Sequence, residues 1–164
     1  MTSSRQGFTL IELLVVIAII GLLATMAVTA LNRIQKKARD TKRAADVEQI
    51  YKALNLFFDH YGCLPVTHGS SCGLGGYSDS NSGSWDYSSQ GGFLGFLETS
   101  GFMPNVPVDP INNMSGDGVP AGSYAYRYYC YPGTGLHLGY WREIDNTYVR
   151  KYPSAWANPD FTCR

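Results

Sequence analysis

The hydrophobic pattern divides the chain into three zones. Residues 8–31 are apolar almost without interruption, and Glu12 is the one charged residue among them. Residues 32–61 carry many charges, whereas residues 62–164 are rich in Gly, Ser, Pro, Asn and Tyr. The pattern predicts an apolar helix over 8–31, an amphipathic continuation over 32–61 and a separate head domain over 62–164.

The first zone is long enough to cross a lipid bilayer. A helix over residues 8–31 spans about 36 Å at about 1.5 Å per residue, and the hydrocarbon core of a bilayer is roughly 30 Å thick. A carboxylate in such a segment costs roughly 2.5–3.5 kcal/mol on insertion scales, so Glu12 needs a partner. The alternative is that Glu12 lies near the interface and extends toward the headgroups.

The second zone continues the helix with a regular apolar stripe. No Pro or Gly interrupts residues 22–61, and Gly62 is a natural stop. The stripe contains Ile34, Ala38, Ala45, Ile50, Leu54, Phe57 and Tyr61. We therefore expect one helix over residues 8–61, about 80 Å long, whose second half packs against the head domain.

The third zone predicts a small sheet. Phe93–Thr99 is typical of a short helix that ends before Gly101, and residues 69–92 have the composition of a long surface loop. Strands are expected at Tyr124–Tyr131, Leu138–Glu143 and Asn146–Arg150. The fold class is therefore α+β, with the long helix packed on the sheet.

A short motif precedes the apolar zone. The segment Gly7–Glu12 has the sequence Gly-Phe-Thr-Leu-Ile-Glu and runs directly into the apolar helix. This arrangement closely resembles the type IV pilins and the type II secretion pseudopilins. The resemblance implies a leader of residues 1–7, cleavage between Gly7 and Phe8 by a membrane prepilin peptidase, and N-methylation of Phe8.

The same resemblance implies a function and a set of partners. Members of this family wait in the bacterial inner membrane with the head outside the cytoplasm. They then join copies of themselves and related subunits in a helical fibre, with the help of an inner-membrane assembly platform. The acid at position 12 is expected to meet the amino terminus of a neighbouring subunit. The fold implied is a long helix on a small antiparallel sheet.

The layout of residues 93–131 is similar to that of the major pseudopilin. A short helix, the segment Pro107–Asn113 and a tyrosine-rich strand follow one another in that order. The chain departs from the pattern at Thr29, where the family often has Pro, and in its cysteines, which major pseudopilins usually lack. A secretion pseudopilus, an adhesion or motility pilus and a DNA-uptake fibre all remain open.

A secretory signal peptide is the main alternative for the first zone. Val28-Thr29-Ala30 has the small residues of a cleavage site, which would give a mature start at Leu31. The apolar run is too long for a signal peptide, and its acid lies near the front. The motif therefore favours cleavage before the apolar segment.

Six basic residues follow the apolar zone against the single acid Asp40. They are Arg33, Lys36, Lys37, Arg39, Lys42 and Arg43. We interpret them as a solvated or headgroup-facing stretch, with a DNA-binding stripe as the alternative. The positive-inside rule would place them in the cytoplasm, whereas the family topology places them outside. The cysteines agree with the family topology, in which the part of the chain after the apolar segment lies outside the cytoplasm.

All four cysteines follow the membrane segment. They are Cys63, Cys72, Cys130 and Cys163, and three pairings are open. We favour Cys63–Cys72, which closes the loop after the helix, and Cys130–Cys163, which ties a strand to the chain end. Disulfides indicate an oxidising, extracytoplasmic location. A zinc site of His60, Cys63, His68 and Cys72 is the alternative, although its spacing is not standard.

Catalysis and nucleic-acid binding find little support. Lys and Arg number 13, as do Asp and Glu, so the chain lacks an overall basic field. No nucleophile motif, phosphate loop or acid–base pair stands out, and we expect no enzyme. The family resemblance adds a calcium ion as a candidate cofactor, with Asp109, Asp117 and Asp145 as its candidate ligands.

A ligand-binding domain is the rival function. A membrane-tethered or secreted carbohydrate-binding domain would use exposed aromatic rings to stack on sugars. The candidates are Trp85, Tyr87, Trp141 and Trp156. The competing interpretation is that these rings pack the small core and the contacts between subunits.

Overall fold

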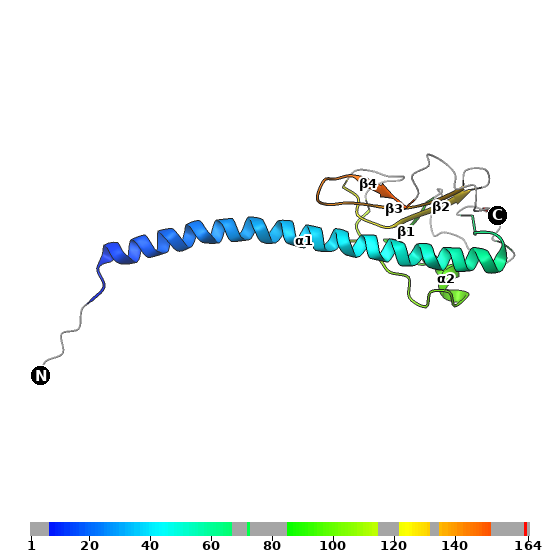
Figure 1. Ribbon diagram of the computed structural model, residues 1–164, viewed down its shortest axis with the longest axis horizontal. Coiled ribbons are helices and arrows are strands. Elements are labelled where there is room, and N and C mark those ends of the chain that lie inside the picture. The colour runs from blue at the N-terminus through cyan, green and yellow to red at the C-terminus, as the bar shows by residue number, and fades with distance from the viewer. Residues whose placement is uncertain are drawn as a thin grey trace, which may run out of the picture.

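The computed structural model describes residues 7–66, 72, 85–114, 122–131, 135–151 and 163. Helix α1 (Leu10–Tyr61) runs through 52 residues without a break and carries the head near its C-terminal end. In Figure 1, the sheet lies on one side of α1 and the short helix α2 (Gly95–Thr99) on the other. The α+β fold class is thereby confirmed.

The ends of α1 follow local rules. Thr9 caps the N-terminus, so the helix begins two residues later than predicted. Gly62 adopts a left-handed conformation with φ of 71°, and its N–H donates to the Phe58 carbonyl at 2.7 Å. A glycine tolerates this conformation without strain, and it ends the helix where the sequence predicts.

The sheet contains four antiparallel strands in sequential order. They are β1 (Asp86–Tyr87), β2 (Arg127–Tyr131), β3 (Gly135–Trp141) and β4 (Tyr148–Arg150). Strands β2, β3 and β4 match the three predicted segments, with β3 starting earlier and β2 starting later. Strand β1 lies in the segment predicted to be a long loop. It was not predicted, because a run of two residues is too short to show the alternation of a strand.

One face of the sheet packs on α1. Tyr128 pairs with Leu138, and Tyr140 pairs with Val149, so their side chains lie on the same face. The buried core joins this face to the helix and to α2. Its helical members are Val47, Ile50, Ala53, Leu54 and Phe57, and Phe93, Leu94, Phe96 and Leu97 come from α2 and the turn before it.

The predicted apolar stripe was wrong in its first half. Ile34, Ala38 and Ala45 are exposed, as is Tyr61 at the end of the helix, although Ile50, Leu54 and Phe57 are buried as expected. The head begins to cover α1 only at Asp40, and the first side chains that it buries are polar ones: Asp40, Arg43 and Asp46. Tertiary contacts, which helical spacing alone does not encode, decide where the buried face begins.

Candidate functional site

The start of α1 holds the motif residues in a defined geometry. Gly7 and Phe8 are non-helical and exposed. Thr9 and Glu12 form a capping box, in which the Thr9 backbone N–H and hydroxyl both donate to Glu12 Oε2 at 2.8 and 2.6 Å. The Glu12 N–H donates to Thr9 Oγ1 at 3.3 Å. The carboxylate is therefore held beside the predicted cleavage site.

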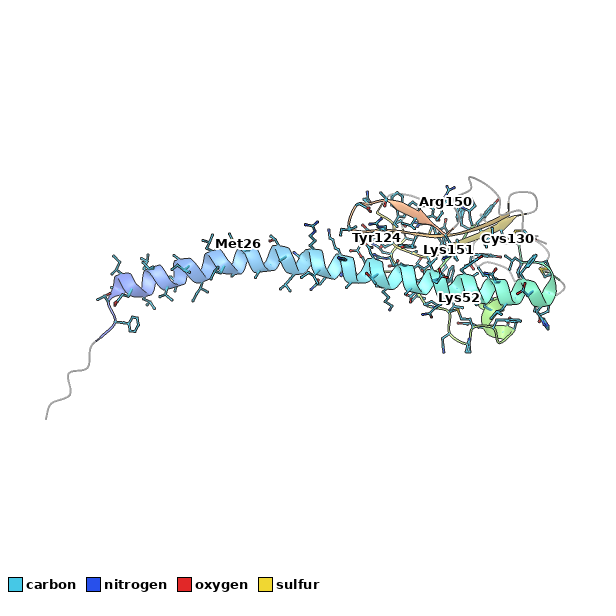
Figure 2. All side chains as sticks on the ribbon, viewed as in Figure 1. Met26, Lys52, Tyr124, Cys130, Arg150 and Lys151 are labelled. Carbon is cyan, nitrogen blue, oxygen red and sulfur yellow. A yellow bond between two sulfur atoms is a disulfide. The ribbon has the colours of Figure 1, made fainter. Side chains whose placement is uncertain are left out.

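The apolar half of α1 is bare. Every residue from 7 to 38 is exposed, and none of the most apolar window is buried within the protein. Figure 2 shows Met26 projecting from this half, whereas Tyr124, Cys130 and Arg150 lie in the head. The segment is long and apolar enough to cross a membrane. An apolar surface of this size needs lipid or other chains to cover it.

A buried arginine joins the helix to the head. The Arg43 side chain is completely buried and donates to both carboxylate oxygens of Asp109, at 2.7 and 3.0 Å. Its remaining terminal nitrogen donates to Asp40 and to Glu143, at 2.8 and 2.7 Å. The guanidinium also lies 5.0 Å from the centre of the Tyr124 ring.

A second arginine reinforces the same carboxylate. Arg39 donates to both oxygens of Glu143, each at 2.7 Å. The backbone N–H groups of Glu143 and Ile144 donate to Asp40. We call Arg39, Asp40, Arg43, Asp109 and Glu143 the clamp. It ties α1 to the loop before Asn113 and to the loop between β3 and β4, which fixes the head on the helix.

The electrostatics of the clamp favour its charged state. Burial opposes the charge of Arg43, but hydrogen bonds to Asp109, Glu143 and Asp40 outweigh it and raise the pKa of the guanidinium. Hydrogen bonds from Arg39 lower the pKa of the Glu143 carboxyl, and burial opposes that shift only in part. Two guanidinium groups thus face three carboxylates, and the pair of Arg43 with Asp109 is completely buried, whereas Arg39 stays in part exposed.

The clamp predicts a loss of stability in acid. A carboxyl whose pKa is lower in the folded state than in the unfolded state stabilises the folded protein at pH values above the unfolded pKa, which is about 4.3 for Glu. This stabilisation disappears as the pH falls through the folded pKa. We expect the free energy of unfolding to decline below about pH 4, and to decline less steeply in Glu143→Gln. Urea unfolding between pH 7 and 3 measures how the free energy of unfolding changes with pH in the parent and in the variant. Equal slopes in the two proteins would contradict a contribution from Glu143.

Near-ultraviolet circular dichroism suits these measurements. All Trp and Tyr residues of the chain lie at or beyond residue 51, whereas the apolar segment has none. The aromatic signal therefore reports the packing of the head and of the helix that it covers. Detergent micelles can shield the apolar half of α1 without adding to this signal.

Comparisons with known proteins agree with the motif. The family model for the prokaryotic N-terminal methylation motif matches residues 2–28. The type IV major pilin protein PilA of Myxococcus xanthus (strain DK1622) is 38% identical over 54 residues, which are 33% of this chain and 24% of that protein. The type II secretion system core protein G of Escherichia coli (strain K12) is 39% identical over 56 residues, which are 34% of this chain and 39% of that protein. The chain therefore carries the prokaryotic N-terminal methylation motif, and over about a third of its length it is similar to a type IV pilin and to a type II secretion core protein.

The family likeness is local. The chain spans about a quarter of one curated relative and about two fifths of the other. No solved structure matches significantly. The comparisons thus support a pilin-like methylation motif, while the head has to be interpreted from its own residues.

Both disulfides of the protein follow the pairing that we favoured. Cys63 is bonded to Cys72, and Cys130 is bonded to Cys163. The first bond uses the two sulfur atoms that the zinc alternative required, and His68 lies outside the described residues. The second bond ties β2 to the chain end, and Leu64 pairs with Cys163 in an isolated bridge.

The candidate calcium ligands do not form one cluster in the described part of the chain. Asp109 accepts from Arg43 and from the backbone N–H groups of Ile111 and Asn112. Asp145 is exposed and bonds to Thr147 and Arg142. Asp117 lies outside the described residues. Calcium binding stays a prediction, and the carboxylate of Asp109 has a structural part in the clamp.

The aromatic candidates of the rival function are mostly occupied. Trp85 stacks on Tyr129 with ring centres 5.1 Å apart, and Tyr87 is buried. Trp141 is partly buried beside Tyr148, and Trp156 lies outside the described residues. The three described rings therefore have contacts with other side chains of the head, and Tyr87 is too deeply buried to stack on a sugar.

The sequence interpretation missed the clamp. It assigned Arg39 and Arg43 to a solvated stretch, but Arg43 is buried and Arg39 is half-buried in ion pairs. A signal was present, because Asp40 and Arg43 continue the spacing of three and four residues set by Val47, Ile50 and Leu54. A helical stripe that changes from apolar to oppositely charged residues indicates buried ion pairs.

Proposed function

We propose that the chain is a structural subunit of a type IV pilus or a type II secretion pseudopilus. One observation carries this proposal: a methylation motif leads into an exposed, uninterrupted apolar helix that extends beyond the head. Copies of such a helix can bury their apolar surfaces against one another. The fibre would then have a helical centre with the heads outside, and the chain would act by assembly rather than catalysis.

Processing would precede assembly. In this proposal the prepilin peptidase cleaves between Gly7 and Phe8, and Phe8 becomes the N-methylated first residue. The subunit waits in the inner membrane with its head on the extracytoplasmic side, as the two disulfides favour. An inner-membrane platform then transfers it to a fibre in the periplasm or at the cell surface.

The clamp would keep the head at a fixed position on α1 during assembly. A fibre of regular geometry needs every head at the same angle to its helix. Apolar packing alone tolerates small rotations, whereas the bidentate contact of Arg43 with Asp109 is directional. The clamp therefore complements the motif. The motif and its apolar helix would hold the subunit in the fibre, and the clamp would orient the head on the fibre surface.

The processing prediction is tested on protein from its native host. We expect intact mass and N-terminal sequencing to give a mature chain that starts at N-methylated Phe8, and we expect Gly7→Val to stay uncut. Gly21→Val is the matched control, because a side chain there meets nothing within 4 Å. A start at Leu31, or an uncut Met1 in the parent chain, would overturn the proposal.

A further inference from the structure

We propose that a notch on α1, which begins on the helix surface and continues under the head, binds the phosphate headgroup of an acidic phospholipid. The inference rests on the membrane-anchored state of the proposed function, and it adds a ligand that assembly does not require. The residues that carry it are Arg33 and Lys37, with Ile144 of the loop between β3 and β4.

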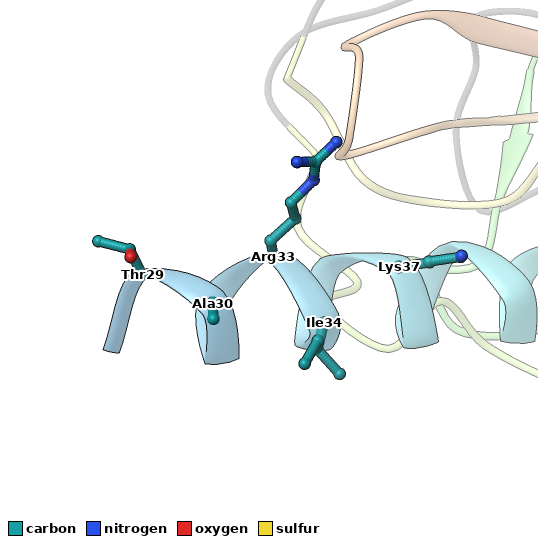
Figure 3. Close-up of a pocket in the computed structure, with 5 residues that line it drawn as sticks. All are labelled: Thr29, Ala30, Arg33, Ile34 and Lys37. Atoms are coloured by element: carbon teal, nitrogen blue, oxygen red, sulfur yellow. The ribbon is translucent and has the colours of Figure 1, made fainter. Parts of the chain in front are cut away.

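The notch is formed by two adjoining hollows. The first lies on the surface of α1 alone and is lined by Thr29, Ala30, Arg33, Ile34 and Lys37. The second lies between α1 and the head and is lined by Lys37, Asp40, Thr41, Ala44, Tyr140, Arg142, Ile144 and Val149. Lys37 lines both, and so connects the end of the apolar helix with the head. Figure 3 shows Arg33 extending from α1 toward the head, whereas Ile34 points to the other side of the helix.

The end of the notch nearest the apolar segment, where Arg33 lies, is at the depth of the headgroup layer. From Leu10 to Leu31, α1 spans about 32 Å, which fills a hydrocarbon core of roughly 30 Å. Arg33 and Lys37 then lie about 3 and 9 Å farther along the helix, and the headgroup region extends roughly 5–7 Å on each side of the core. Long basic side chains at this depth reach the lipid phosphates.

The notch carries positive charge. Of the six basic residues in this stretch, Arg39 and Arg43 are engaged in the clamp. Arg33, Lys36 and Lys37 are exposed and make no ion pair with any described residue. Asp40 is occupied by Arg43 and by backbone N–H groups, and Asp145 pairs with Arg142. The charge of Arg33, Lys36 and Lys37 is therefore available to an anion.

An apolar side chain lines the part of the notch that lies against the head. Ile144 is 38% exposed at the tip of the loop between β3 and β4, and it lines the hollow that contains Lys37. Ile144 therefore closes the notch on the side of the head. The anion is identified as a phospholipid by the position of Arg33, which follows directly on a segment long and apolar enough to cross a membrane.

Native mass spectrometry of the full membrane-extracted protein tests this proposal. The protein is held in detergent micelles doped with phosphatidylglycerol or with phosphatidylcholine, and the apparent Kd of each lipid is obtained from the bound fraction. The test variant is Arg33→Gln/Lys37→Gln. The control variant is Lys42→Gln/Lys52→Gln, which removes the same charge from exposed positions outside the notch.

We expect the parent protein to bind phosphatidylglycerol at least tenfold more tightly than phosphatidylcholine. The test variant should lose about 30-fold in affinity for phosphatidylglycerol, because each basic side chain near an anionic surface contributes roughly fivefold. The control variant should lose less than threefold. Near-ultraviolet circular dichroism should show the same folded head in all three proteins.

Several results would overturn the lipid site. They are equal losses in the two variants, equal affinity for the two lipids, displacement of phosphatidylglycerol by equimolar inorganic phosphate, and a dimer that forms without lipid and disappears only in the test variant. The last result would mean that a second copy fills the notch. A chain that never enters the membrane fraction would instead overturn the proposed function.

Discussion

Arg43→Met should destabilise the head by about 3–5 kcal/mol. Removing one partner of a buried ion pair leaves the other charge buried and uncompensated. Asp109 would lose both hydrogen bonds from the guanidinium, and its side chain is as completely buried as that of Arg43. Urea unfolding in detergent micelles, followed by near-ultraviolet circular dichroism, measures the change in the free energy of unfolding.

The adjacent Lys42 provides the matched control for Arg43. Lys42 is exposed and takes no part in the clamp, so Lys42→Met should change the free energy of unfolding by less than about 0.5 kcal/mol. The double variant Arg43→Met/Asp109→Leu should recover part of the loss, because it removes the stranded charge as well. Equal unfolding midpoints for Arg43→Met and Lys42→Met would show that the clamp contributes little.

Glu12→Ala should leave synthesis and processing intact and reduce fibre formation at least tenfold. A carboxylate in the apolar segment is costly unless a positive partner meets it, and the new amino terminus of a neighbouring Phe8 would be such a partner. Glu12→Gln should behave in the same way, because it keeps the size of the side chain and removes its charge. Sheared fibres, quantified against total subunit, give the measurement.

The capping box supplies a control that separates two roles of Glu12, the pairing with a neighbouring subunit and the capping of α1. The carboxylate also accepts from Thr9 and so stabilises the start of α1, an effect of about 1 kcal/mol. Thr9→Ala removes the capping hydroxyl but keeps the charge. We expect Thr9→Ala to assemble nearly normally; a defect as deep as that of Glu12→Ala would assign the effect to helix capping instead.

The local elements of this protein could be predicted from neighbouring residues. An unbroken apolar run from Phe8, the absence of Gly and Pro after Leu22, and the stop at Gly62 define α1 almost to the residue. Alternating aromatic residues define β2. These features depend on helix and strand periods and on end residues, which are properties of short stretches of sequence.

The tertiary structure alone decided which charges are buried. Arg43 lies 66 positions from Asp109 and 100 positions from Glu143, and no local period relates such residues. Arg33 and Arg43 look alike in the sequence, yet Arg33 is exposed beside the apolar segment and Arg43 is buried under the head. The motif around Gly7 and Phe8 was readable because it is a local signal, whereas the clamp exists only where the head covers α1 and excludes water.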